Sequence, residues 1–325
     1  MNVNQLKNII QKQTKNLELS YQILENRYKL WLDALEQSRD SYRLLKLFTN
    51  RQIMIMIILL TKSVDHRKTK HHLLKILSSF DNINVSEENE VTLTNKYLTH
   101  YFQSLRFTSC DLSAENINRL CMKHKIESIN NDSEFLKRLA LFLHELFDNG
   151  KELFAGDTPL SENQQYLVTI NQLEDQSSFK HSLDLKTCSI LLNIFHNRLP
   201  AYYQILWCST ATKEDIELFF SRVRTFYKLT YVVMDIDVMH HKFREKLLHE
   251  QNLLSQQQEV HGCVYYFSKE ITNWRNDLQP FHFTHEHQNS DVAYNKVNRL
   301  FESYNIQKPE IEIVCGDSGV GKQSL

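Results

Sequence analysis

Residues 203–237, YQILWCSTATKEDIELFFSRVRTFYKLTYVVMDID, decide the fold class of the second half of this chain. The apolar run at 203–208 is typical of a buried strand, and residues 213–227 have the spacing of an amphipathic helix that starts after a capped turn. A second apolar strand follows at 231–237 and ends in two aspartates. Strands that alternate with helices form a parallel sheet covered on both faces, so we expect an α/β domain here.

The same alternation continues toward the C-terminus. The pattern predicts a helix at 239–257, a strand at 261–267 and another helix at 290–304. A last apolar strand then runs into a glycine-rich loop and would open a further unit. We therefore expect an α-helical N-terminal half followed by a three-layer α/β domain of the P-loop NTPase or AAA type, in a chain truncated at a P-loop.

The first fifty residues carry a regular heptad pattern. From Ile10 to Leu45, apolar and aromatic residues recur at alternating steps of four and three, with Thr14 and Ser38 as the polar exceptions. This spacing predicts one long helix. Because its seam is rich in bulky aromatic residues, which pack irregularly, we favour a helical hairpin against neighbouring helices over a two-stranded dimer. The functional interpretation is a stalk or linker.

Shorter helical patterns fill the stretch from 52 to 199. Residues 135–147 form an amphipathic helix, and Asn149 with Gly150 provides its stop. The most apolar run, at 53–60, has eight residues, whereas a membrane-spanning helix needs about 20. We therefore expect a buried segment there and no membrane span.

Composition excludes several classes of protein. The length of 325 residues suggests two or three domains. The formal net charge of −1 gives no indication of a nucleic-acid or membrane partner. Six glycines and four prolines are few, which favours long helices over a turn-rich all-β fold. No C-x-x-C pair occurs among the six cysteines, which fits reduced thiols in the cytosol: Cys110, Cys121, Cys188, Cys208, Cys263 and Cys315.

The last sixteen residues, EIEIVCGDSGVGKQSL at 310–325, contain a phosphate-binding loop. The spacing G-x-x-x-x-G-K lets backbone N–H groups surround a phosphate while the lysine supplies a positive charge. The motif then requires Ser or Thr as a magnesium ligand, but this chain has an amide, which is a poor ligand for that ion. We expect ATP binding in preference to turnover, with Mg²⁺ coordination weakened. The predicted nucleotide-binding residues are Gly316, Asp317, Ser318, Gly319, Val320, Gly321, Lys322, Gln323 and Ser324.

A working P-loop also needs a helix whose N-terminus faces the phosphates and an acidic strand end for the metal. Neither follows Lys322 in this sequence. We therefore expect the chain to be a piece of a longer protein, with no complete active site and no catalytic residue of its own.

Asp235 and Asp237 resemble the acidic strand end that positions magnesium in P-loop enzymes. In those enzymes the acidic strand follows its P-loop, and the strand and turn upstream here, at 205–213, contain a lysine but no glycine. Backbone without glycine does not readily adopt the positive-φ conformations that surround phosphate. We interpret this unit as a P-loop-like fold that has lost its nucleotide.

Two further clusters are interpreted as structural. His282, His285 and His287 lie near Glu286, but a zinc site would need more ligands from elsewhere, so we expect a surface role and no metal. The basic stretch 62–75 has the pattern of a solvated helix face. No serine occurs in a G-x-S-x-G elbow, and no cysteine has a local catalytic signature.

Several segments together resemble the mysterin-type giant RING-finger E3 ubiquitin ligases, which have a dynein-like AAA+ core. The segments are ILWCSTATKEDIELFFSRV, YVVMDIDVMHHKFREKLL, VYYFSKE and the GDSGVGK loop, together with RYKLWLDALEQSRDSYRLLKLFTNRQ near the N-terminus. The resemblance implies a helical linker at 1–198, a degenerate AAA-like unit at 199–306, and the first strand and P-loop of a following AAA unit at 307–325.

The resemblance also implies the setting of this chain. The parent would transfer ubiquitin through a zinc-binding RING and a further ligase module, both downstream, and this chain would act as scaffold and relay. Its partners would be the downstream AAA units of the same chain and, through the parent, the ubiquitin machinery. The implied location is the cytosol, with association with lipid droplets.

A second class of protein fits the same order of elements. In a signalling NTPase of the STAND type, a helical interaction region precedes one nucleotide-binding module, and partner-sensing repeats follow. The long helical first half fits either class, whereas two α/β units in tandem fit the AAA+ ligase better.

Overall fold

The computed structural model describes residues 3–60, 70–75, 90–103, 110–126, 132–151, 153, 165–169, 187, 190–196, 198, 200–256, 261–268 and 279–280. The chain forms two compact units. Unit 1 comprises residues 1–169 and 201–281, and unit 2 comprises residues 170–200 and 282–325. All elements named below belong to unit 1.

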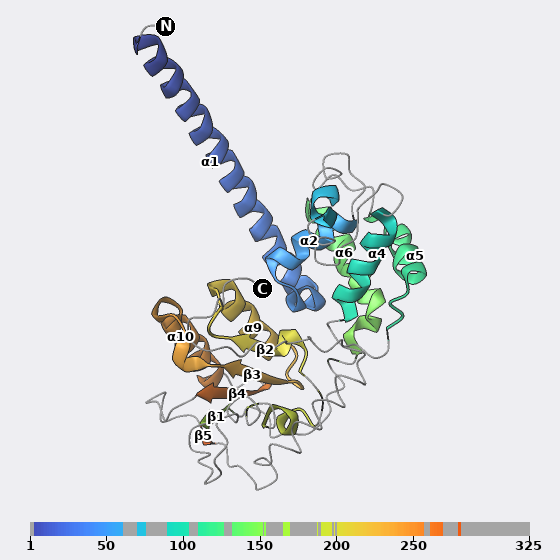
Figure 1. The fold of residues 1–325 in the computed structure, drawn as a ribbon. Coiled ribbons are helices and arrows are strands. Elements are labelled where there is room, and N and C mark those ends of the chain that lie inside the picture. The colour runs from blue at the N-terminus through green and yellow to red at the C-terminus, as the bar shows by residue number, and fades with distance from the viewer. Residues whose placement is uncertain are drawn as a thin grey trace, which may run out of the picture. The chain divides into compact units, whose positions relative to one another are not determined.

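The N-terminal heptad pattern folds as one continuous helix, α1 (Val3–Ser41) (Figure 1). It ends four residues before Leu45, because the backbone of Tyr42 is extended and a 3-10 helix, η1 (Arg43–Leu47), turns the corner. The long helix is thus confirmed, but its predicted end is wrong by one turn. Leu45 is fully buried in this corner, so it packs into the core without belonging to the helix.

Helix α2 (Asn50–Leu60) contains the most apolar run of the chain. Thr49 and Gln52 exchange hydrogen bonds across its first turn, with Gln52 N donating to Thr49 Oγ1 over 3.2 Å and Thr49 N donating to Gln52 Oε1 over 2.8 Å. This capping box starts the helix directly after the corner. The run is therefore a buried helical segment, as expected, and none of the described helices is long and apolar enough to cross a membrane.

The helical part also contains α4 (Glu90–Gln103), α5 (Ala114–Lys123) and α6 (Asp132–Leu146). Helix α6 contacts α1, and a short 3-10 helix, η4 (Asp148–Gly150), follows it. Gly150 has a φ of 67°, which a residue with a Cβ adopts only at a cost, so the predicted stop is confirmed.

The second half contains a five-stranded sheet in which every pair of neighbours is parallel. Its order is β2-β3-β4-β1-β5. The strands are β1 (Gln165–Thr169), β2 (Ile205–Trp207), β3 (Thr230–Met234), β4 (Cys263–Ser268) and β5 (Gln279–Pro280). A parallel sheet was expected and is confirmed, although the strands are shorter than the apolar runs that predicted them.

Helices α9 (Lys213–Thr225) and α10 (His241–Gln256) cover one face of this sheet (Figure 1). Alternate strand residues, such as Tyr231 and Val233, pack beneath them in one apolar cluster. Val232, which alternation places on the opposite face, is also fully buried. Burial on both faces explains why β3 reads as a continuous apolar run.

Sequence analysis did not find β1, which lies in the stretch that we expected to be helical. Its sequence, QYLVT, is short and begins with a polar residue. The strand pairs with β4 from Gln165↔Val264 to Thr169↔Ser268, so a segment upstream of residue 199 completes the sheet. The predicted boundaries at 198/199 and 306/307 stay predictions, and the predicted helix at 290–304 lies outside the described residues.

Candidate functional site

The carboxyl edge of the sheet carries the two aspartates that the sequence singles out. Strand β3 ends at Met234, and Asp235 then adopts a left-handed conformation with φ 54° and ψ 51° before a short 3-10 turn. Ser268, at the end of neighbouring β4, donates its hydroxyl to Asp237 Oδ1 over 2.8 Å. The structure therefore places both aspartates just beyond the strand, where ligands bind in open parallel sheets.

Cys208 lies beside these carboxylates, because its backbone N–H donates to the carbonyl oxygen of Met234 over 3.1 Å. Burial raises the pKa of the Cys208 thiol to about 12, and the negative charges of Asp235 and Asp237 act in the same direction. A thiol in this state is no nucleophile at neutral pH. In the described part of the chain, no three His, Cys, Asp or Glu residues gather closely enough to hold a metal ion.

The turn after β2 leads into a helix whose N-terminus is capped by side chains of its own first turn. Thr212 caps α9: its hydroxyl accepts from Asp215 N over 3.2 Å, while Asp215 Oδ2 accepts from Thr212 N over 2.9 Å. These are two of the donors that a helix N-terminus would otherwise offer to a phosphate. The carboxylate of Asp215 at this end also repels an anion, which agrees with the lack of glycine in the turn.

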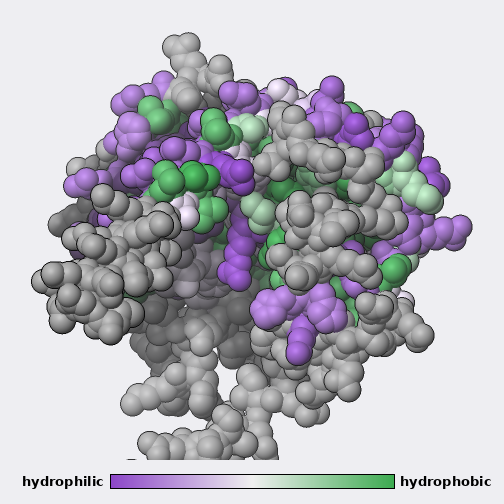
Figure 2. Space-filling model, turned by 90° about the horizontal axis from the view of Figure 1, so that it is seen from above, coloured by the Kyte–Doolittle hydropathy of each residue, from purple (hydrophilic) through white to green (hydrophobic). Residues whose placement is uncertain are grey.

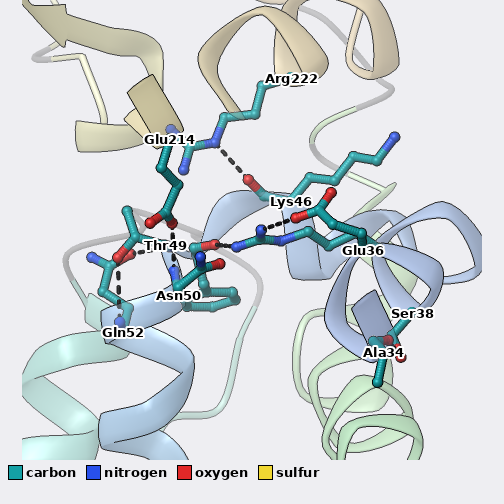
Figure 3. Close-up of polar contacts among 11 residues, drawn as sticks. Ala34, Glu36, Ser38, Lys46, Thr49, Asn50, Gln52, Glu214 and Arg222 are labelled. Atoms are coloured by element: carbon teal, nitrogen blue, oxygen red, sulfur yellow. Dashed lines mark hydrogen bonds and ion pairs between the residues drawn. The ribbon is translucent and has the colours of Figure 1, made fainter. Parts of the chain in front are cut away.

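A second site lies where α9 meets the corner between α1 and α2 (Figure 3). Arg222 of α9 donates from Nε to the carbonyl oxygen of Lys46 over 2.6 Å. Its two terminal nitrogens donate to the carbonyl oxygens of Leu47, over 3.1 Å, and Tyr203, over 3.4 Å. Tyr202 adds its hydroxyl to the Leu47 oxygen over 2.7 Å. One guanidinium thus joins the corner to the residues that lead into β2.

Glu214, two helical turns before Arg222, contacts the same corner from its other side. Its Oε1 accepts from the backbone N–H of Asn50 over 2.7 Å (Figure 3). Asn50 is the first residue of α2, so the carboxylate lies at the positive end of that helix. Helix α9 therefore offers a cation to the carbonyls of the corner and an anion to its N–H group.

Helix α1 contributes a second buried guanidinium. Arg39 donates to the carbonyl oxygen of Phe48 over 2.6 Å and forms an ion pair with Glu36 at 2.7 Å. Three consecutive carbonyls, those of residues 46, 47 and 48, thus accept hydrogen bonds from buried arginines. We call this set, Arg39, Glu214 and Arg222 around residues 46–50, the corner clamp.

The two guanidinium groups of the clamp are almost closed to solvent. Arg222 is 5% exposed and Arg39 is 3% exposed. Burial lowers the pKa of Arg222, although a guanidinium remains charged at neutral pH. Buried charge is costly unless hydrogen bonds compensate for the lost water, so removal of either guanidinium leaves carbonyl groups unsatisfied in the core.

The clamp is also tied to the centre of the sheet. Tyr231 of β3 donates its hydroxyl to the carbonyl oxygens of Arg222, over 2.9 Å, and Phe226, over 3.3 Å. Burial raises the pKa of Tyr231, so the phenol stays protonated and able to donate. Strand β3 ends three residues later, next to Asp235. A continuous path of packed groups therefore runs from the α1–α2 corner to the carboxyl edge of the sheet.

Sequence analysis missed the clamp residues. Charged residues on an amphipathic helix usually lie on its solvated face, and Glu214 and Arg222 look ordinary in KEDIELFFSRVRT. The available signal was spacing: Arg222 stands three residues after Phe219, at the edge of the apolar side of α9. The predicted P-loop, from Gly316 to Ser324, and the three histidines at 282–287 lie outside the described residues.

Comparison with protein-family models, with curated proteins and with solved structures found no match to this chain.

Proposed function

We propose that this chain is a mechanical junction. It would join a helical linker to a nucleotide-type α/β unit that has lost its nucleotide, and would transmit movements between the two. The observation that carries the proposal is the bond pattern of Arg222, which fastens the corner after α1 to the helix that follows β2. Buried hydrogen bonds and packed side chains between rigid elements are the kind of contact through which movements are coupled.

Three features support a degenerate AAA-like unit over a functional one. The turn before α9 has no glycine, the N-terminus of α9 is capped by Thr212 and Asp215, and Cys208 is an inert buried thiol. In this proposal, Asp235 and Asp237 lie where a metal-binding strand end would lie, and the described turn after β2 has no glycine to form a phosphate loop.

We further propose that the parent is a mysterin-like AAA+ E3 ubiquitin ligase of the cytosol, with additional AAA units and the zinc-binding ligase parts downstream. Determination of the transcript beyond codon 325 tests this proposal. Successive AAA units followed by a Cys/His zinc cluster are the expected result. Leucine-rich or tetratricopeptide repeats in their place would favour the STAND class instead.

The terminal loop is proposed to bind ATP through its glycine-rich backbone and Lys322. For residues 1–325 alone we expect negligible ATP turnover and weak binding, because turnover requires a helix N-terminus at the phosphates and an acidic strand end in addition to the loop. Phosphate release measured with Lys322→Ala as the control checks this. Robust turnover that the substitution abolishes would contradict the proposal.

A further inference from the structure

Helix α10 begins shortly after the turn that ends strand β3. This turn, η6 (Ile236–Val238), follows Asp235, and α10 starts at His241 (Figure 1). Met239, between the two, is buried, whereas Val238 is 51% exposed. Apolar and polar side chains likewise lie side by side over the described surface (Figure 2). The start of α10 is therefore a solvent-accessible section next to the carboxyl edge of the sheet.

His240 caps this helix with its imidazole ring. The backbone N–H of Lys242 donates to His240 Nδ1 over 3.3 Å, and the N–H of Phe243 donates to the carbonyl oxygen of His240 over 2.9 Å. The ring thus satisfies an N–H group that a helix start leaves without an intrahelical partner. The usual capping residues accept through an oxygen at neutral pH, whereas a ring nitrogen stops accepting once it binds a proton.

Protonation of His240 would act against the helix in two ways. Both nitrogens of an imidazolium are donors, so Nδ1 could no longer accept from Lys242. The new charge would also lie at the positive end of α10, whose first turn contains no acidic residue, and the ring centroid of His241 is only 4.5 Å away. The charged and titratable groups on the two elements that His240 joins are Asp235 and Asp237 before it and His241, Lys242, Arg244 and Glu245 after it.

The rest of α10 is held by other contacts. Lys246 forms ion pairs with Glu217 of α9 and with Glu250, each at 2.9 Å. Glu250 also pairs with Arg224 of α9 at 3.1 Å, and Leu247 is fully buried in the apolar cluster beneath the helix. None of these contacts involves His240. Loss of the cap should therefore release the first turn of α10 and leave the remainder of the helix in place.

We propose that His240 makes the start of α10 a pH-sensitive switch. Histidine is the side chain whose charge ordinarily changes between about pH 5 and 8. At the upper end of this range the neutral ring caps the helix, and at the lower end the protonated ring releases the first turn, beside η6. Because the capped state binds fewer protons, a rising pH favours it. This inference does not depend on the proposed function.

Amide hydrogen exchange of the full chain, measured residue by residue by NMR, tests the inference. Rates at pH 7.5 and pH 5.5 are each compared with those of an unstructured chain, which removes the intrinsic effect of pH. We expect the protection of the Lys242 amide to fall at least about threefold at the lower pH, which is the effect of losing a cap of ordinary strength. The amides of residues 250–254 should keep their protection.

Three variants identify the titrating group. His240→Asn keeps a capping oxygen that does not titrate, so the Lys242 amide should be equally protected at both pH values. His240→Ala should lack this protection already at pH 7.5. His249→Gln, at an exposed histidine of the same helix, is the matched control and should behave like the unchanged chain. Equal protection at both pH values in the unchanged chain, or an equally large loss in His240→Asn, would overturn the inference.

Discussion

Arg222 Nε lies 2.6 Å from the carbonyl oxygen of Lys46, although 176 residues separate the two in sequence. This hydrogen bond joins the helical N-terminal part to the α/β part of the same compact unit. Both residues form further hydrogen bonds. Tyr231 donates its hydroxyl to the carbonyl oxygen of Arg222, and Lys46 Nζ donates to Thr225 Oγ1 over 3.2 Å. The contact is therefore part of a fixed network.

Replacement of Arg222 should destabilise the chain strongly. Arg222→Met keeps most of the apolar stem but leaves the buried carbonyls of Lys46 and Tyr203 without this donor, which we expect to cost about 3 kcal/mol. Arg222→Lys should be only partly better, because one ammonium group does not reproduce the planar fork. Urea unfolding measures both. Arg119→Met, at an exposed position, is the control and should change stability by less than about 0.5 kcal/mol.

Glu214 should contribute mainly through its charge. Glu214→Gln keeps an oxygen that can accept from Asn50 N but removes the anion at the start of α2, so we expect a loss of about 0.5–1 kcal/mol. High salt should reduce the difference between the two proteins, because the site is only partly buried. Unfolding at low and at high ionic strength checks this. An equal loss in both conditions would show that the charge is not responsible.

Glu250 of α10 should make stability depend on pH. Burial alone would raise its pKa, but hydrogen bonds and charge from Lys246 and Arg224 outweigh burial and hold the pKa below its usual value near 4.5. A lowered folded-state pKa stabilises the protein above the unfolded value, and this stabilisation is lost as the pH falls through the folded pKa. Below about pH 4.5, the chain should therefore lose stability more steeply than Glu250→Gln. Parallel curves for the two proteins between pH 3 and 7 would contradict the prediction.

Cys208 should be unreactive in the folded protein. Its pKa of about 12 and its burial leave almost no accessible thiolate at pH 8. Cys263, with a pKa of about 11, should behave alike, whereas Cys110 is only half-buried and should react sooner. Timed iodoacetamide labelling followed by mass spectrometry measures the order. Labelling of Cys208 as fast as Cys110 would contradict the burial argument.

Sequence patterns predicted the elements whose periodicity is strong. Helices α1 and α9 were recognised from the helical spacing of their apolar residues, and strand β3 from its continuous apolar run. Both patterns directly reflect which side chains are buried. Strand β1 was missed because five residues with a polar start carry no period, and its place in the sheet depends on pairing with a segment about 100 residues away. Pairing over such distances leaves no local trace.

The candidate site was predictable only in part. Asp235 and Asp237 could be placed at a strand end, since the acids follow an apolar run. The corner clamp could not, because its acceptors are the backbone carbonyls of residues 46–48, and any sequence has such groups. What makes them a site is the break of α1 at Tyr42, which the heptad pattern conceals by continuing to Leu45.

Rigid coupling of α1 to α9 through Arg222 is the central claim, and a distance measurement tests it directly. Spin labels at Gln37 on α1 and Lys213 on α9, both exposed, report the distance between the two helices by double electron–electron resonance. We expect one narrow distribution in the otherwise unchanged chain and a clearly broader one in Arg222→Met under conditions where both remain folded. A broad distance distribution in the chain with Arg222 intact would contradict the claim. So would an equally narrow distribution in Arg222→Met.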